Sequence, residues 1–122
     1  MELIIIIVVV GILAAVAIPK YLDLTDQAAD GTARGVLGAL RSQNTLMFSQ
    51  SVLGGTAASY TMLDIANNVG ELKGYDWTAA VTRFTMTVGG NNYRFTLTPT
   101  PFPPTTFGSI TAGPGGNPRA TW

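Results

Sequence analysis

Carboxylates near the start of the chain are the side chains best placed to do chemistry in this sequence. Glu2 directly precedes residues 3–18, a stretch without a charged or hydrogen-bonding side chain. A carboxylate beside such a stretch is costly to bury and is usually functional, although it also favours the dipole of a helix N-terminus. Asp23, Asp26 and Asp30 are spaced along a predicted helix and lack the loop of a calcium-binding EF-hand. We therefore interpret these three aspartates as a solvated helix face and predict no metal site.

Two residue types that carry much of enzyme chemistry are missing from the sequence. The 122 residues include no His and no Cys, which removes the commonest general base, any thiol nucleophile and any disulfide. The 7 Lys and Arg residues balance the 7 Asp and Glu residues, and they form no basic cluster of the kind that grips nucleic acid. We therefore predict that the chain is not an enzyme, has no catalytic or cofactor-binding residues, and has no nucleic-acid partner.

Residues 3–18 read LIIIIVVVGILAAVAI and form a long apolar stretch. A helix needs roughly 20 apolar residues to cross a bilayer, so this stretch is slightly short. A signal peptide is disfavoured because no Lys or Arg precedes the stretch. A buried core helix is disfavoured because so small a chain cannot cover a helix that is apolar all round. We favour a helix that is buried partly by lipid and partly by copies of itself.

The N-terminal sequence MELIIIIVVVGILAAVAIPKYLDL closely resembles the start of type IV pilins and of type II secretion pseudopilins. Four residues occupy matching relative positions in that family: Glu2, Gly11, Pro19 and Tyr21. Residues 33–50, ARGVLGALRSQNTLMFSQ, resemble the helix of the mannose-sensitive-haemagglutinin type of pilin. Family members carry a few residues before the glutamate, so the resemblance implies that residues precede Met1.

This resemblance implies a structural function, as the repeating subunit of an extracellular type IV pilus that serves adhesion, motility or surface attachment. A prepilin peptidase would remove a leader, the new N-terminus would be methylated, and the subunit would be anchored in the inner membrane. The pilus assembly machinery would then add it to a helical homopolymer of identical subunits. The resemblance also implies that Glu2 pairs with the N-terminal ammonium of an incoming subunit, an attraction that is weakly screened in lipid.

Two alternative functions stay open at this point. A type II secretion pseudopilin shares the N-terminal motif and builds a periplasmic pseudopilus. Major pseudopilins tend to bind calcium in a C-terminal loop, and residues 99–122 contain no acidic residue, which disfavours this alternative. A membrane-anchored binding module is the other alternative, and it is disfavoured because the predicted globular part has no His, no Cys and no paired carboxylates.

Gly11 and Pro19 bracket a segment that is apolar but weak as a helix. Pro19 lacks an N–H group and its ring crowds the carbonyl of Ala15, and glycine costs a helix about 1 kcal/mol against alanine. A static kink is one interpretation. We favour a loss of helical hydrogen bonding over residues 11–19 when this segment moves from lipid into a filament core.

After Pro19 the sequence becomes amphipathic, and we expect the helix to continue to about Val52 and to end at Gly54 and Gly55. An apolar stripe is predicted to pack on the sheet of the same chain: Leu22, Ala29, Ala33, Val36, Leu37, Leu40 and Met47. A stripe of small residues on the opposite side is predicted to pack against neighbouring subunits: Ala28, Gly31, Gly35 and Gly38. The alternative is that these glycines merely weaken an ordinary helix.

The whole pattern predicts an α+β protein with the pilin fold, in which a long N-terminal helix packs on a small antiparallel sheet. Residues 1–53 form the helix, with a membrane or filament-core segment over residues 1–19 and an amphipathic half over residues 20–53. Residues 54–122 form a globular head with a loop over residues 54–80, a sheet over residues 81–112 and a C-terminal tail. Within the loop, Thr61 and Asp64 have capping-box spacing and predict a short helix to about Asn67.

The clearest strand signal is VTRFTMTVGGNNYRFTLT, residues 81–98, in which apolar and polar residues alternate. A two-residue turn at Gly90 and Asn91 would make three cross-strand pairs: Val88 with Tyr93, Met86 with Phe95, and Phe84 with Leu97. The alternation puts six apolar residues on one face, which we expect to lie on the helix: Phe84, Met86, Val88, Tyr93, Phe95 and Leu97. Residues 105–112 are predicted to supply a third strand.

Overall fold

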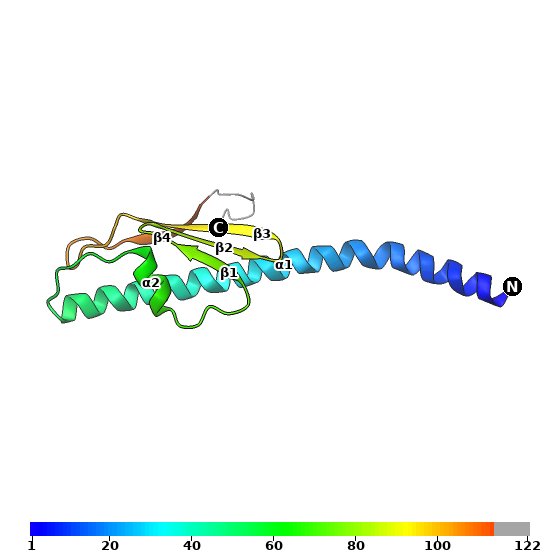
Figure 1. Cartoon of the computed structure of the whole chain (residues 1–122), viewed down its shortest axis with the longest axis horizontal. Helices are drawn as coiled ribbons and strands as arrows, with labels where there is room; N and C mark the ends of the chain where they lie inside the picture. Colours follow the sequence, from blue (N-terminus) through cyan, green and yellow to red (C-terminus); the bar gives the residue numbers. More distant parts are fainter. Residues whose placement is uncertain (114–122) are drawn as a thin grey trace.

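The computed structural model describes residues 1–113 and shows an α+β protein, in which a four-stranded antiparallel sheet lies along a long N-terminal helix (Figure 1). The helices are α1 (Glu2–Leu53) and α2 (Met62–Asn68). The strands pair in chain order: β1 (Asp76–Ala79), β2 (Arg83–Val88), β3 (Asn91–Thr98) and β4 (Ser109–Gly113). This pilin-like arrangement confirms the predicted fold class. The predicted C-terminal tail beyond residue 113 lies outside the described residues.

Helix α1 has 52 residues and is about 78 Å long at 1.5 Å per residue. Its N-terminal half projects beyond the head, and its C-terminal half runs along the sheet (Figure 1). The helix is continuous through Pro19, although Figure 1 shows a bend in the projecting half. It ends at the two predicted glycines, where the amide of Gly55 donates to the carbonyl of Val52 and the amide of Thr56 to Ser51. This is a Schellman cap, and its left-handed residue, Gly55 with φ 66°, favours glycine.

Helix α2 begins at the predicted capping box. The amide of Asp64 donates to the hydroxyl of Thr61 over 3.3 Å, and the amide of Thr61 donates to the carboxylate of Asp64 over 2.8 Å. The helix ends at Asn68, one residue later than predicted. Met62, Ile65 and Ala66 are buried, so this short helix extends the core between α1 and the sheet.

Strands β2 and β3 form the predicted hairpin, but the predicted register was wrong by two residues. The turn lies at Gly89 and Gly90, which gives these pairs: Val88 with Asn91, Met86 with Tyr93, and Phe84 with Phe95. Both glycines have positive φ, 57° and 79°, as a type I′ turn requires, and glycine adopts this conformation without strain. Because side chains alternate with a period of two, a shift of two residues keeps every side chain on its predicted face.

The sheet has one more strand than the sequence analysis predicted. Strand β1 lies within residues 54–80, which had been predicted as a connection with one short helix. It pairs with β2, and the ring of Trp77 stacks on Phe84 with 5.5 Å between ring centroids. The strand predicted within residues 105–112 is present as β4, which begins at Ser109. The preceding loop contains a β-bridge between Phe102 and Thr106.

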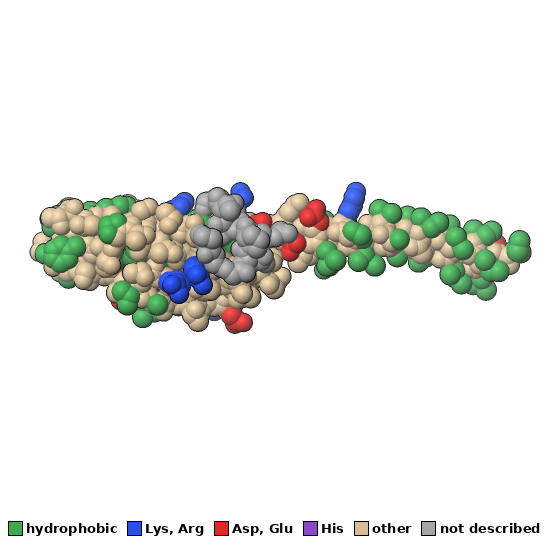
Figure 2. Space-filling model, turned by 90° about the horizontal axis from the view of Figure 1, so that it is seen from above, with side chains coloured by type: hydrophobic (Ala, Val, Ile, Leu, Met, Phe, Trp, Pro, Cys, Tyr) green, Lys and Arg blue, Asp and Glu red, His purple; other side chains and the backbone are tan. Residues whose placement is uncertain are grey.

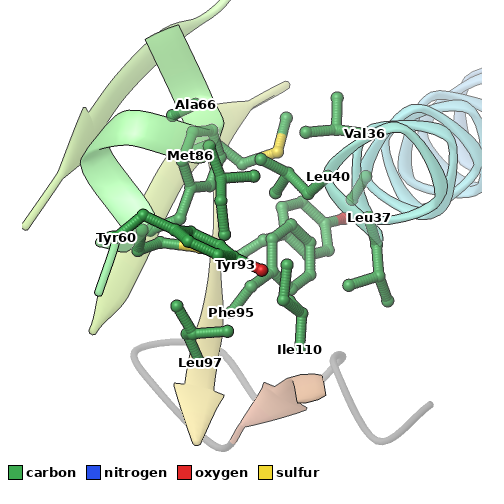
Figure 3. Packing of buried hydrophobic residues seen from close by; sticks show 14 of the residues in the cluster. Val36, Leu37, Leu40, Tyr60, Ala66, Met86, Tyr93, Phe95, Leu97 and Ile110 are labelled. Carbon is green, nitrogen blue, oxygen red and sulfur yellow. The ribbon is translucent and has the colours of Figure 1, made fainter. Parts of the chain in front are cut away.

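The hydrophobic core fills the space between α1 and the inner face of the sheet (Figure 3). Helix α1 contributes buried residues from the predicted apolar stripe: Ala29, Ala33, Val36, Leu37 and Leu40. The strands contribute Phe84, Met86, Tyr93, Phe95, Leu97 and Ile110. Val88, next to the hairpin turn, is only half-buried. Leu22 of the predicted stripe is exposed, because the hairpin turn ends over Thr25 and Ala29 and no strand within residues 1–113 reaches further along the helix.

Candidate functional site

The projecting half of α1 is the most unusual surface of the molecule. The helix is long and apolar enough to cross a membrane, with a mean hydropathy of 2.8 over an 18-residue window. None of that window is buried by the other described residues. Figure 2 shows hydrophobic side chains along this half, with charged side chains concentrated closer to the head. An exposed apolar surface of this size marks a contact with lipid or with other protein.

The four residues that resemble the pilin motif all lie on this projecting half. Glu2 is in the first turn of α1, where its negative charge favours the helix dipole. Gly11 lies in open surroundings, because a Cβ added there would meet no atom within 4 Å. Pro19 is inside the helix, and Tyr21 is 72% exposed. Their predicted roles in assembly stay predictions, because the structure contains a single chain.

The small-residue stripe lies open on the side of α1 that faces away from the sheet. Its members are exposed: Ala28, Gly31, Gly35 and Gly38. A Cβ added at any of the three glycines would meet no atom within 4 Å, so the chain itself gives no packing reason for glycine there. Another helix could approach closely along this stripe.

The interpretation of the three aspartates as a solvated face was wrong for two of them. The Asp26 carboxylate accepts a hydrogen bond from the Asn91 amide over 3.1 Å. The Asp30 carboxylate accepts one from the Tyr93 hydroxyl over 2.5 Å. Both bonds fix the start of β3 to α1, whereas Asp23 is exposed. Among residues 1–113, no group of three potential metal-binding side chains lies close enough together to hold an ion.

Two polar side chains of α1, Arg41 and Asn44, tie the helix to residues 108–110, and Tyr60, which precedes α2, bonds to Asn44; the sequence pattern had not predicted any of these bonds. Arg41 donates through Nε to the carbonyl of Ile110 over 3.0 Å. Asn44 is 2% exposed and donates to the carbonyl of Gly108 over 2.6 Å. Its side-chain oxygen accepts a 2.8 Å bond from the hydroxyl of Tyr60. A signal for Asn44 was present in the sequence, because it lies between Leu40 and Met47 on the buried stripe.

Burial also changes the acidity of Tyr60. Desolvation of its side chain raises the pKa of the phenol from 10.0 to about 12. The neutral hydroxyl therefore persists to higher pH in the folded chain than in an unfolded one, and it keeps donating to Asn44.

Comparison with known proteins gives one informative match. No protein-family model matches the chain, and no solved structure matches it. The chain is similar to the type IV narrow pilus major component PilA5 of Thermus thermophilus, with 49% identity over 41 residues. The match covers 34% of this chain and 35% of the relative, so it concerns about one third of either protein.

The fold, the apolar helix and this relative agree on a class of protein. A 52-residue helix that begins with an apolar half and carries an antiparallel sheet is the arrangement of a type IV pilin. The partial match to a pilus component supports the same resemblance to the type IV pilins. Together they support a structural subunit of the pilin type.

Proposed function

We propose that this chain is the repeating subunit of an extracellular type IV pilus. The observation that carries this proposal is that the apolar side chains on the projecting half of α1 are exposed to solvent in the described single chain. Lipid can cover this surface before assembly, and the equivalent helices of other copies can cover it afterwards. The relative that is a major component of a type IV pilus supports the same function.

The route to the filament follows from the same surface. The subunit waits in the inner membrane with the apolar half of α1 in lipid, after a prepilin peptidase has removed a leader and the N-terminus has been methylated. The pilus assembly machinery then moves it into a homopolymer that serves adhesion, motility or surface attachment. The chain acts through packing and not through catalysis.

Glu2 has a specific role in this proposal. Within the apolar surroundings of a filament core, its carboxylate pairs with the N-terminal ammonium of a neighbouring subunit. An unpaired charge in such surroundings is costly, so the pair selects the subunit that enters in the correct axial position.

Electron microscopy and mass spectrometry of sheared surface filaments test the proposal directly. We expect filaments that consist of this chain and that disappear when its gene is deleted, while protein secretion continues. Loss of secretion with no change in surface filaments would instead identify a pseudopilin.

Variants at Glu2 test the assembly chemistry in cells that make no other pilin. We expect Glu2→Ala to enter the membrane at a normal level and to give few filaments, whereas Glu2→Asp, which keeps the charge, should retain part of the yield. A normal filament yield from Glu2→Ala would exclude the proposed pairing.

A further inference from the structure

The end of the head that is remote from the N-terminus exposes apolar side chains. We name four of them the distal patch: Val52, Leu53, Phe102 and Phe107. Leu53 is 88% exposed. Two of the segments that supply this end, residues 42–63 and 95–113, contain no Asp, Glu, Lys or Arg, whereas the turn between β1 and β2 is followed by the exposed Arg83, which pairs with Thr96. On the face drawn in Figure 2, this end of the described chain likewise shows apolar and neutral side chains.

The distal patch has a shape that can receive a side chain. A surface hollow beside it is lined by Phe48, Ser49, Val52 and Leu53. The ring of Phe107 packs edge-on against the ring of Phe48, with 5.1 Å between centroids and 89° between planes. Because the two rings hold each other in place, an incoming apolar side chain meets a surface that is already formed.

The composition of this end restricts what it can bind. A charged partner would lose hydration there without gaining an opposite charge from residues 42–63 or 95–113. Anionic lipid headgroups would likewise find no Lys or Arg in these segments. The distal patch therefore suits an apolar partner surface whose charged side chains stay outside the contact.

The same chain offers such a partner where α1 leaves the head. We name Tyr21, Leu22 and Leu24 the proximal turn, and their side chains are 61–72% exposed. Lys20 directly precedes this turn, and Asp23 lies between Leu22 and Leu24 in sequence but on the opposite side of the helix, so residues 20–24 carry no net charge. The distal patch and the proximal turn are thus both exposed in the described single chain. Both lie on the surface of a molecule that is proposed to polymerise.

We infer that the distal patch of one copy packs on the proximal turn of a second copy that is displaced along the filament axis. This inference rests on the proposed function as a filament subunit. Leu22 and Leu53 are joined by the unbroken helix α1 and lie 31 residues, or about 46 Å, apart. If the second copy is displaced by about 46 Å along the axis of α1, its proximal turn lies at the same height as the distal patch of the first copy.

The contact is of the kind that builds a filament. The distal patch and the proximal turn are different surfaces, so the contact is head-to-tail, and an assembly of any length still offers one free surface of each kind, one at each end. It therefore repeats along the assembly without closing. It also cannot form within one chain, because α1 holds the two groups apart.

Disulfide trapping tests the inference without interference from native cysteines, because the sequence contains none. The full chain carries Leu22→Cys together with Leu53→Cys, is expressed as the sole pilin, and is oxidised in intact filaments with copper phenanthroline. We expect a non-reducing gel to show a ladder of dimers, trimers and longer multimers. Each single-cysteine variant is a control that can form no ladder through this contact.

A matched pair tests the axial position. In the continuous helix of the single chain, Ala15→Cys places the first cysteine of the pair with Leu53→Cys two turns nearer the N-terminus than Leu22, about 10 Å away, and the predicted loss of helix over residues 11–19 would lengthen this distance. Because a disulfide needs Cα atoms within about 7 Å, this pair should give far less multimer. A second pair, Leu24→Cys with Val52→Cys, is prepared in parallel so that the test does not depend on one variant.

The outcomes separate the inference from the proposed function. Normal filaments in which both close pairs stay monomeric would overturn the inference and leave the function intact. A stronger ladder from the Ala15 pair would also overturn it, because the distal patch would then pack on the apolar run. Absence of filaments from the unaltered chain would overturn the proposed function and the inference with it.

Discussion

The side-chain amide of Asn44 donates a buried 2.6 Å hydrogen bond to the carbonyl of Gly108, which lies 64 residues further along the chain. Gly108 has no room for a side chain, because a Cβ would lie 2.5 Å from the carbonyl oxygen of Pro99. The backbone there is therefore pressed into the head, and its carbonyl is turned towards the helix. Asn44 satisfies that carbonyl and in the same place accepts the hydroxyl of Tyr60.

We expect Asn44→Ala to lower the free energy of unfolding of the head by about 1–3 kcal/mol, because it leaves the Gly108 carbonyl without its donor. The Tyr60 hydroxyl loses its 2.8 Å bond to the side chain and keeps the 3.2 Å bond to the backbone carbonyl of residue 44. Urea denaturation followed by circular dichroism measures this change. Thr45→Ala is the matched control, since the Thr45 hydroxyl is exposed and bonds only to its own helix at Arg41. Equal effects from the two variants would contradict the importance of the buried bond.

A fragment that begins at Leu24 should be a soluble monomer. It lacks the projecting apolar half of α1 but keeps the whole stretch that packs on the sheet, from Ala29 to Asn44. Analytical ultracentrifugation gives its mass, and hydrogen exchange shows whether the core is formed. Oligomers of this fragment would mean that the head associates without the apolar run.

In this fragment, Phe95→Ala should cost about 3–5 kcal/mol of stability, because Phe95 is fully buried and its ring stacks on Phe84. Thr98→Ala on the same strand is exposed and should change stability by less than about 0.5 kcal/mol. Chemical denaturation compares the two. A loss below about 1 kcal/mol for Phe95→Ala would place that side chain outside the core.

The raised pKa of Tyr60 predicts a loss of stability at high pH. Below pH 10 the phenol is neutral in both states, so its contribution is fully present. Between pH 10 and about pH 12 the unfolded chain releases the proton and the folded chain keeps it, so stability falls, by about 3 kcal/mol at most. The free energies of unfolding of the wild type and of Tyr60→Phe, measured by chemical denaturation, should therefore converge over this pH range. A constant difference between them would contradict the shifted pKa.

The helix around Pro19 is expected to change on assembly. In the single chain α1 is continuous, yet Gly11 and Pro19 weaken the segment between them, and Ala14, Ala15 and Ala17 offer little side-chain packing to hold it. We predict that helical hydrogen bonding is interrupted over residues 11–19 in the filament. A filament map by electron cryomicroscopy decides this, and a continuous helix from Glu2 through Lys20 would refute it.

Local patterns predicted the parts of the fold that depend on neighbours in sequence. Alternation in residues 81–98 predicted the inward face, and Thr61 with Asp64 predicted the start of α2. The register failed because two turn positions were compatible with the alternation. The choice between them involves Asn91, whose place at the start of β3 lets it bond to Asp26, 65 residues away.

Dependence on residues that are distant in sequence also explains the other differences between the predicted and the observed structure. Strand β1 is four residues long and forms through its pairing with β2. Its residues, DWTA, alternate between polar and apolar, but four residues are too few to distinguish a strand from a connection by pattern alone. Asp30 looked like part of a solvated face because its partner, Tyr93, comes from a distant segment. The apolar run was evident from composition alone, whereas what covers it depends on other molecules.

The strands run nearly along the axis of α1, so a filament under tension loads the junction between head and helix in shear (Figure 1). Side-chain bonds from Asp26, Asp30, Arg41 and Asn44 are spread over five turns of that junction and would have to yield together. Among the described residues, the projecting half of α1 has no such attachment to the head. Mechanical stretching of the filament would therefore begin in that half, and the heads would stay folded while the fibre lengthens.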